Sequence, residues 1–474
     1  MQRNYDVIIV GGGGAGLSAA IAAHDAGASC ILLEADTHLG GATANSGGVF
    51  YAANTSVQRT HGVIGDTPEA MVEYIMTLNQ WKTRPDLVTH YANEAGPVLE
   101  WLISIGADFP GGHLVCSGVE SVARGHACAG GGAGIGEPLI NAVGARGIET
   151  VLDCRVESLI FDEGNVVGVR AQGMALYAPC VIITTGGIGN SPDMLKRLYP
   201  SSWHEGWTWA VHRDNPFILG DGLTMAENIG AEIVGFDTGL VLPTSGFWKA
   251  LEPWLPPWIM VVNKEGRRFM SELSPYSACG YLINEQTERR VWAIFDDKAL
   301  VDASADTSYL DPYKNGMNIP TWEESTIRDQ VAKGRVKQAA TLEELARITG
   351  IDPIALAQTV KVYNDDAKRG KDTHFYKKAP ILCPIASGPF YAVEIRAAII
   401  GNTSVGLNID ESTRVLDTHG CPIPGLYAAG EVLGCWQGPR YAGGGLAVGG
   451  AIVFGLLAGQ VAAREAQSVA ALAA

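Results

Sequence analysis

The most constraining feature of this 474-residue chain is a glycine-rich loop near its N-terminus. Residues 6–10 (DVIIV) form a short apolar run that is typical of a buried parallel strand. Residues 17–28 are rich in alanine and favour a helix. Between them lies the spacing G-x-G-x-x-G, formed by Gly11, Gly13 and Gly16. A second apolar run, residues 30–33, ends at Glu34, so this part of the chain predicts a β-loop-α-β unit.

Each glycine of this loop has a physical role in binding a dinucleotide. Gly11 allows a tight turn, Gly13 lets the backbone approach a pyrophosphate, and Gly16 lets the helix pack closely on the strand. Gly14 and Ala15 open the helix, where N–H groups and the macrodipole favour a phosphate. The loop therefore predicts a Rossmann-type dinucleotide-binding domain.

Glu34 and Ala35 follow the second predicted strand. At the end of that strand, the Glu34 carboxylate is placed to accept the ribose hydroxyls of the dinucleotide, and an acidic residue there argues against a bound 2′-phosphate. A second glycine-rich turn, residues 39–48, begins a few residues later.

The rest of the chain indicates one insertion into this domain. Alternating runs at residues 150–152, 156–161 and 166–170 predict a small antiparallel meander, and a buried strand at 180–185 runs into a glycine turn. Residues 237–402 lose the alternation of strand and helix, with helices expected at 342–348 and 353–363. We predict an α/β fold: a Rossmann-type domain made of residues 1–236 and 403–474, with an inserted α+β catalytic (capping) domain at 237–402.

Composition excludes several kinds of partner. The net charge of −16, with no run of Lys or Arg, argues against nucleic acid. The nine scattered cysteines contain no C-x-x-C pair, and His126 and Cys128 have no ligands near them in the sequence, so we expect no metal and a reducing, cytoplasmic compartment. No leader peptide is expected at the N-terminus. Residues 442–463 are uncharged but rich in glycine, which favours a helix buried in the domain over an integral membrane segment. Peripheral membrane contact stays open.

Several motifs together resemble the fumarate reductase/succinate dehydrogenase flavoprotein superfamily. They are the second glycine turn at 39–48, Thr-Thr-Gly-Gly at 184–187, Asn-Lys-Glu-Gly-Arg-Arg-Phe at 263–269 and the run at 425–431. The resemblance implies an FAD-binding Rossmann-type domain, with Ala42-Thr43 in place of the His-Thr pair that carries covalent FAD and His38 displaced upstream. We therefore expect FAD to be bound non-covalently. Beyond the first loop, Glu34 and Ala35, the cofactor-binding residues implied are Gly40, Gly41, Ala42, Thr43, Ser46, Gly47, Gly48, Val156, Thr185, Gly186, Gly187, Asp221, Gly222, Gly430, Glu431, Gly445, Leu446 and Ala447.

The chain departs from the dicarboxylate reductases of this superfamily where they bind substrate. Leu242 replaces the histidine of their His-Pro-Thr, Tyr276 replaces their proton-donating arginine, and Ala442 replaces their last arginine, with Arg440 nearby. Arg267 and Arg268 are interpreted as solvated or structural charges. A neutral, apolar substrate pocket is expected.

Tyr276, Tyr441 and Gly445 instead resemble the 3-ketosteroid Δ1-dehydrogenases. The resemblance implies that Tyr276 removes the proton α to a ketone, while Tyr441 and the Gly445 N–H hold the ketone oxygen. In that family the FAD domain supplies another tyrosine, but residues 109–136 contain none. Six tryptophans are candidates for an apolar substrate mouth or for packing: Trp203, Trp207, Trp209, Trp248, Trp254 and Trp258.

Three hypotheses on function follow. The first is FAD-dependent α,β-dehydrogenation of a hydrophobic cyclic ketone, with a 3-ketosteroid as the favoured substrate and an unidentified electron acceptor. The second is the reverse chemistry, a reductase of an enone or enoate. The third is a non-catalytic flavin-binding carrier. The sequence does not distinguish the first two, because the direction depends on the flavin potential and on the electron partner.

Overall fold

The computed structural model describes residues 4–251, 253–311 and 318–473. The chain forms two compact units. The first comprises Met1–Pro200, His212–Leu240 and Gly401–Ala474, and the second comprises Ser201–Val211 and Val241–Ile400. The sequence assigned residues 201–211 to the first domain, but they belong to the second unit because Trp209 and Ala210 pair with Ile399 and Ile400.

The first unit is built on a six-stranded sheet in the order β19-β20-β10-β1-β2-β6. Its strands are β1 (Val7–Val10), β2 (Cys30–Leu33), β6 (Glu149–Val151), β10 (Cys180–Ile183), β19 (Arg414–Leu416) and β20 (Pro422–Ala428). Strand β1 pairs in parallel with both β2 and β10. All residues of β1, β2 and β10 are buried, as expected for short apolar strands at the centre of a parallel sheet. The predicted α/β fold with a Rossmann-like sheet is confirmed.

The predicted meander differs from the observed one. Residues 149–151 form β6, which pairs in parallel with β2 and extends the main sheet. The antiparallel meander consists of β7 (Val156–Asp162), β8 (Asn165–Ala171) and β9 (Met174–Tyr177). The expectation for residues 150–152 was wrong because strand direction and pairing partner depend on where the helix before β6 returns the chain, and alternation alone does not report this.

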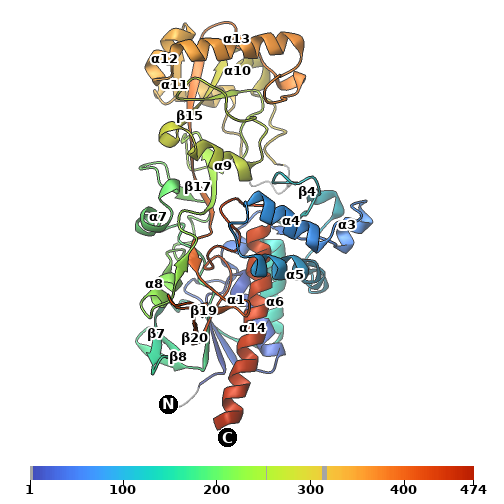
Figure 1. Ribbon diagram of the computed structural model, residues 1–474, viewed down its shortest axis with the longest axis vertical. Coiled ribbons are helices and arrows are strands. Elements are labelled where there is room, and N and C mark those ends of the chain that lie inside the picture. The colour runs from blue at the N-terminus through green and yellow to red at the C-terminus, as the bar shows by residue number, and fades with distance from the viewer. Residues whose placement is uncertain (1–3, 252, 312–317, 474) are drawn as a thin grey trace. The chain divides into compact units, whose positions relative to one another are not determined.

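Two long helices pack beside the sheet of the first unit. Helix α1 (Gly14–Asp25) begins at Gly14 rather than at Leu17, because the Leu17 N–H already donates to the Gly13 carbonyl over 2.9 Å. Helix α14 (Leu446–Ala473) lies along α1 (Figure 1). Carbon atoms added at Gly455 and Gly459 would lie 2.4 and 2.2 Å from carbonyl oxygens of α1, so glycine allows this close crossing.

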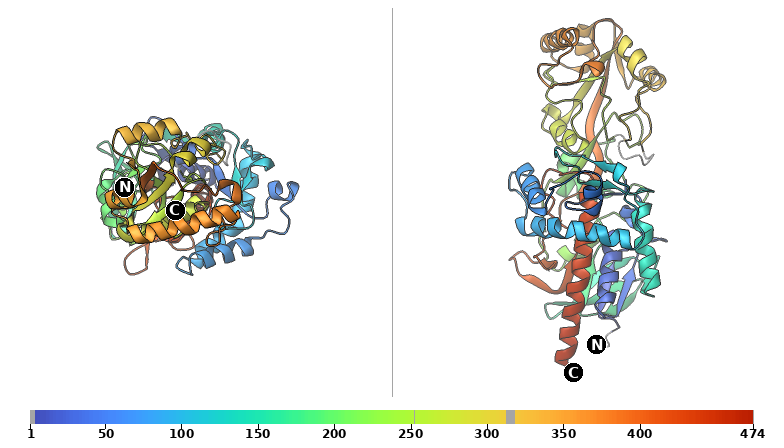
Figure 2. Two further views of the ribbon diagram at one scale, coloured as in Figure 1. Left: turned by 90° about the horizontal axis from the view of Figure 1, so that it is seen from above. Right: turned by 90° about the vertical axis from the view of Figure 1, so that its right-hand side faces the viewer.

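Helix α14 is also long and apolar enough, by length and composition, to cross a membrane. Its most apolar window is 61% buried inside the protein. Gly449 and Gly450 face Tyr91 and Trp436, and a Cβ at either position would lie within 2.3 Å of those rings or their hydroxyl. Protein packing therefore accounts for the glycines of this helix, and the second view in Figure 2 shows α14 running beside other helices of the same unit.

The first unit contains further helices and short strands outside the main sheet. They are α2 (Gly41–Ala44), β3 (Val49–Tyr51), α3 (Ser56–Thr60), α4 (Pro68–Leu78), α5 (Pro85–Ser104), β4 (Leu114–Val115), β5 (Gly125–Ala127), α6 (Ala133–Ala145), α7 (Pro192–Leu198), α8 (Asp221–Glu227), β12 (Ile233–Val234) and β18 (Gly406–Leu407). Strands β3, β5 and β4 form a small antiparallel sheet of their own.

The second unit contains a mixed sheet in which β17 is the long central strand. It contains all or most of the residues of β11 (Trp209–Ala210), β13 (Gly239–Thr244), β14 (Met260–Asn263), α9 (Tyr276–Asn284), β15 (Val291–Asp296), α10 (Asp297–Ala303), α11 (Glu324–Ala332), β16 (Lys337–Ala339), α12 (Leu342–Thr349), α13 (Pro353–Arg369) and β17 (Phe390–Thr403). Helix α13 begins at an Asp352 cap and extends to Arg369, six residues past its predicted end, because the first left-handed residue that stops it is Gly370.

Candidate active site

The first glycine loop has the geometry of a phosphate cradle. Gly11 has a φ of +107°, and a Cβ there would lie 2.5 Å from the Thr184 carbonyl oxygen. A Cβ at Gly16 would lie 1.8 Å from the Gly11 carbonyl oxygen, whereas one at Gly13 would meet no atom within 4 Å. No side chain caps α1 at Gly13. The open position therefore coincides with a helix N-terminus that can accept an anion.

The Glu34 carboxylate is buried at the end of β2. It accepts the Gly12 N–H at 2.5 Å and the Asp36 N–H at 2.8 Å. These hydrogen bonds fix the carboxylate beside the first glycine loop, with Ala35 partly exposed next to it. A carboxylate offers about four acceptor positions, so its predicted contact with ribose hydroxyls stays compatible with this geometry.

The second glycine turn lies directly beside the first. The Gly40 N–H donates to the Gly12 carbonyl at 2.9 Å, and Gly13 and Gly40 form a parallel bridge. The turn continues as the short helix α2, which contains Gly41, Ala42 and Thr43. It closes where the Ser46 hydroxyl donates to the Thr43 carbonyl and accepts the Gly48 N–H, on the far side of Gly47. The structure thus brings together two glycine segments that the sequence separates.

A third segment closes the same edge of the sheet. The Thr184 hydroxyl lies 2.9 Å from the Val10 carbonyl and 2.8 Å from the Gly11 carbonyl, which ties β10 to the first loop. The next residues are Thr185 and Gly186, and a Cβ at Gly186 would meet no atom within 4 Å. This is a second open position on the backbone beside the first glycine loop.

Glu431 lies at the end of β20, directly after Gly430. Its carboxylate accepts the Thr403 N–H at 2.8 Å and the Thr403 hydroxyl at 3.1 Å. A Cβ at Gly187 would come within 2.5 Å of the Glu431 carboxylate. Burial raises the pKa of the Glu431 carboxyl, and the hydrogen bonds from Thr403 act in the opposite direction. As a whole residue, Glu431 is partly exposed.

Three further predicted cofactor residues lie in this unit with different surroundings. Val156 is buried at the start of β7. The Gly222 N–H donates to the Thr185 hydroxyl at 3.2 Å, which links α8 to the third segment. Asp221 forms a two-pronged ion pair with Arg155, at 2.7 and 2.8 Å. The cofactor roles of Val156, Asp221 and Gly222 stay predictions.

Tyr441 and Gly445 lie in the segment just before the start of α14. The Tyr441 hydroxyl accepts the N–H of Ala447, in the first turn of α14, at 3.0 Å. Gly445 has a φ of +100°, and a Cβ there would lie 2.8 Å from the backbone of residues 49–51. Within the part of the chain that the structure describes, the Gly445 N–H has no hydrogen-bond partner. Leu446 is the first residue of α14, so a phenol and an N–H donor lie together at a helix N-terminus.

Tyr276 belongs to the second unit, whereas Tyr441 and Gly445 belong to the first, so each is described within its own unit. Tyr276 is the first residue of α9 and is buried. Trp254 packs edge-on against its ring, with centroids 5.5 Å apart. Among the other tryptophans considered, Trp209 and Trp258 are buried packing residues, and Trp248 is exposed over more than a third of its surface.

The predicted structural role of Arg268 has a clear physical basis. Its buried guanidinium pairs with Glu272 at 2.8 Å and with Asp372 at 3.0 Å. Lys377, also buried, lies 3.6 Å from the same Glu272 carboxylate. Arg267 is exposed. This charge cluster ties together residues that are far apart in the sequence of the second unit.

Sequence reasoning missed a polar cluster beside Tyr441. Glu120, Ser117 and Tyr74 are hydrogen-bonded to one another and to the backbone between Tyr441 and Gly445. The Tyr51 hydroxyl is buried close by and has no hydrogen-bond partner among the described residues. No spacing signal could have revealed this cluster, because its members come from β3, α4 and the loop after β4.

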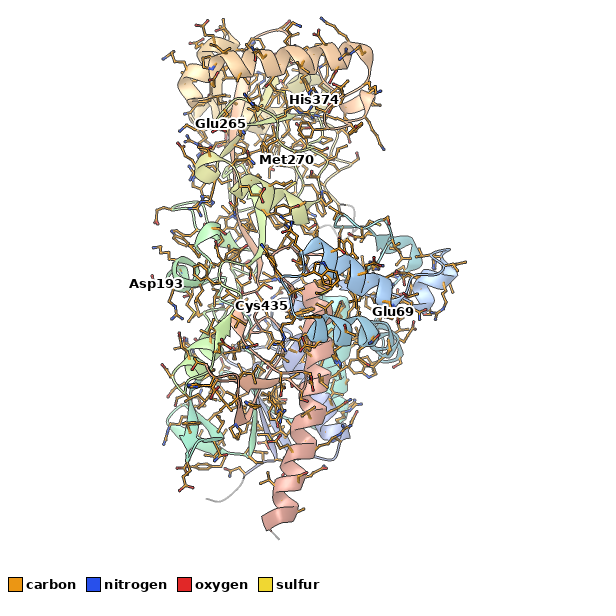
Figure 3. The ribbon with its side chains drawn as sticks, viewed as in Figure 1. Glu69, Asp193, Glu265, Met270, His374 and Cys435 are labelled. Atoms are coloured by element: carbon orange, nitrogen blue, oxygen red, sulfur yellow. The ribbon has the colours of Figure 1, made fainter. Side chains whose placement is uncertain are left out.

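Metal binding was not predicted. Both ring nitrogens of His126 are engaged, by the Thr55 hydroxyl and the Arg124 carbonyl, each at 2.8 Å. Within the described residues, one group of three side chains is close enough to hold an ion: Asp366, Asp372 and His374, the last of which is labelled in Figure 3. Its carboxylates already accept hydrogen bonds or ion pairs from neighbouring groups. The absence of a metal stays a prediction.

Comparisons with known proteins agree with this geometry. A family model described as an FAD binding domain matches residues 6–448. The chain belongs to this FAD-binding family.

It is 32% identical to "Fumarate reductase (cytochrome)" of Shewanella frigidimarina, over 97% of this chain and 77% of that protein. It is 26% identical to the 3-oxosteroid 1-dehydrogenase of Mycolicibacterium smegmatis, over 98% of both proteins. The structure of the 3-ketosteroid-Δ4-(5α)-dehydrogenase from Rhodococcus jostii RHA1, in complex with 4-androstene-3,17-dione, is similar with a TM-score of 0.78 and 26% identity, over 98% of this chain and 97% of that one.

The residues of this FAD-binding protein fit the cofactor. The backbone is open at Gly13 and Gly186, the places where a Cβ would enter a cradle beside the sheet. Glu34 and Glu431 place carboxylate acceptors near these two positions, and α1 presents an uncapped N-terminus. The protein is an FAD-dependent oxidoreductase that acts on CH–CH bonds.

Proposed function

We propose that this FAD-dependent oxidoreductase introduces a C=C bond α,β to the ketone of an apolar cyclic substrate, of the 3-ketosteroid class. The observation that carries the proposal is the pair of groups at the start of α14. The Tyr441 hydroxyl accepts the Ala447 N–H, and Gly445 offers an N–H without a partner in the described chain. A phenol that accepts a hydrogen bond becomes a stronger donor, and donors at a helix N-terminus stabilise negative charge that develops on a ketone oxygen.

The proposed mechanism assigns a role to each of three residues. Tyr441 and Gly445 bind the ketone oxygen and favour the enolate. Tyr276, in its phenolate form, accepts the proton from the α-carbon and becomes the neutral phenol; its ring is buried beside Trp254. FAD, when bound through the glycine loops and Glu431, supplies the acceptor for the hydrogen of the β-carbon. We propose that FAD is bound non-covalently, since Ala42 precedes Thr43 in the second glycine turn.

The substrate class is supported by neutral residues where the dicarboxylate reductases carry charges. Leu242, Tyr276 and Ala442 are all buried and uncharged. Relatives of both substrate classes match nearly the whole chain. At these three positions a dicarboxylate would meet no cationic partner, which is costly for a desolvated carboxylate, whereas a cyclic ketone needs only the donors at α14.

The test is anaerobic mixing of the purified FAD protein with a 3-keto-4-ene steroid, followed by flavin absorbance and by the mass of the product. Rapid bleaching with a product two hydrogens lighter is expected. Tyr276→Phe and Tyr441→Phe should each lower kcat by about a hundredfold or more while the FAD content is retained. Full activity in either variant would remove that residue from the mechanism.

A reductase of an enone or enoate is the second candidate, favoured by the 32% identity to a fumarate reductase. The same residues would then donate the proton and bind the carbonyl of the unsaturated substrate. Oxidation of the dithionite-reduced protein by an enone or by an enoate, with no bleaching by any saturated ketone, would establish this direction.

A further inference from the structure

The backbone that connects Tyr441 to Gly445 is held at two points by side chains from elsewhere in the first unit. The Tyr74 hydroxyl donates to the Ala442 carbonyl at 2.7 Å. The Gly444 N–H donates to the Ser117 hydroxyl. These hydrogen bonds join residues 368 and 327 positions apart in the sequence. They constrain the peptide groups immediately before the Gly445 N–H.

One carboxylate connects the two points. Glu120 is 8% exposed. It accepts the Ser117 N–H at 2.9 Å and lies 3.1 Å from the Tyr74 hydroxyl. One oxygen of the Glu120 carboxylate therefore holds the Ser117 N–H, and the other lies beside the Tyr74 hydroxyl, whose single proton is shared between Glu120 and the Ala442 carbonyl.

The backbone is packed against this carboxylate without space for a further methyl group. A Cβ at Gly118 would lie 2.0 Å from the Ala442 carbonyl oxygen and 2.4 Å from the Glu120 carboxylate. A Cβ at Gly443 would lie 2.7 Å from the Tyr51 ring and 3.3 Å from the other Glu120 oxygen. Because Gly118 and Gly443 have no side chain, the loops of residues 116–120 and 441–445 can lie in direct contact.

We propose that Glu120 is a positioning residue for the ketone-oxygen site. Through Ser117 and Tyr74 it fixes the backbone of residues 442–444, and this backbone sets where the Gly445 N–H and the Tyr441 hydroxyl point. The inference rests on the function proposed above. An oxyanion site depends on preorganised donors within a few tenths of an ångström of their productive position, so loosening this support lowers the rate without removing a donor.

The experiment uses the full-length FAD protein and two variants, Glu120→Gln and Tyr74→Phe. Tyr427→Phe is the matched control, because it also removes a tyrosine hydroxyl that donates to a glutamate, Glu465, in the same unit. The probe is a 3-keto-1,4-diene steroid, which already carries the new double bond. Infrared difference spectra give the carbonyl stretch of the bound probe, and steady-state kinetics with the 4-ene steroid give kcat and KM separately.

The wild-type protein and Tyr427→Phe should shift the carbonyl stretch to lower frequency, as two donors polarise it. Glu120→Gln and Tyr74→Phe should lose much of this shift and about tenfold or more in kcat, with KM, FAD content and melting temperature nearly unchanged. If the wild-type protein shifts the band and either variant shifts it equally, with unchanged kcat, the positioning role is overturned while the proposed function stands. No shift in the wild-type protein overturns the proposed function and this inference with it.

Discussion

A single methyl group meets very different surroundings at three glycines of the first loop. At Gly11 and Gly16 it would collide with backbone carbonyls, at 2.5 and 1.8 Å, and at Gly13 it would point into open space. The first two glycines are therefore required by the fold of the chain itself. Gly13 is required only if a ligand approaches the backbone at this position, where the pyrophosphate of the cofactor is expected.

These surroundings predict opposite behaviour for two alanine variants. Gly13→Ala should change the stability of the FAD-free protein by about 1 kcal/mol or less, because Gly13 has an ordinary φ of −75°, yet weaken FAD binding at least tenfold. Gly16→Ala should lower both the stability of the FAD-free protein and its affinity for FAD. Thermal unfolding without FAD and titration of FAD fluorescence measure the two effects. FAD affinity in Gly13→Ala equal to wild type would show that the cofactor does not approach this position.

At the scale of elements, the position of α1 depends on α14. The crossing of these helices buries Gly455 and Gly459 against α1 carbonyl oxygens. Helix α1 starts at the first glycine loop and α14 starts at the proposed ketone-oxygen site. This helix pair therefore links the first glycine loop to the proposed ketone-oxygen site.

A larger residue in this crossing should disturb both stability and cofactor binding. Gly459→Val places a Cβ 2.2 Å from the Ala19 carbonyl oxygen, so α1 and α14 must separate, at a cost of about 2 kcal/mol or more. We expect a lower melting temperature and weaker FAD binding. Gln460→Ala, at an exposed position next to it, is the control and should behave like wild type. A melting temperature unchanged in Gly459→Val would contradict the close crossing.

At the scale of the whole molecule, both units contain histidines whose pKa is lowered by desolvation. Burial lowers the pKa of His126 and His212, in the first unit, and of His204, in the second, to about 4. The ordinary pKa of histidine is about 6.5. Because the unfolded chain takes up these protons first, stability is complete above about pH 6.5 and is lost as the pH falls toward 4.

The sign of this linkage gives a pH prediction. Each histidine should cost roughly 1 kcal/mol of stability at pH 5.5 relative to pH 7.5. In His212→Gln, which cannot take up a proton, the fall in melting temperature between these pH values should be smaller than in wild type. The measurement is thermal unfolding at both pH values with saturating FAD. An equal fall in both proteins would mean that His212 is accessible to protons in the folded state.

Much of the first domain could be predicted from the sequence because its signals are local. An apolar run of four residues, a glycine spacing and an alanine-rich helix specify β1, the first loop and α1 within twenty residues. The same holds for β2 and β10. The pairing of β6 could not be predicted. Its short run of residues has the same alternation of polar and apolar side chains in a parallel edge strand as it would have in an antiparallel meander.

The sequence indicated which residue types lie at the candidate site, but not which hydrogen bonds hold them in place. The sequence determined that a tyrosine and a glycine precede a long apolar helix, and that a carboxylate ends the second strand. Only the tertiary structure decided that the Tyr74 hydroxyl, beside Glu120, holds the Ala442 carbonyl, and that burial lowers the pKa of three histidines. The physical reason is that such hydrogen bonds and burial join residues hundreds of positions apart, and a polar residue has the same sequence signature at the surface as in a buried network.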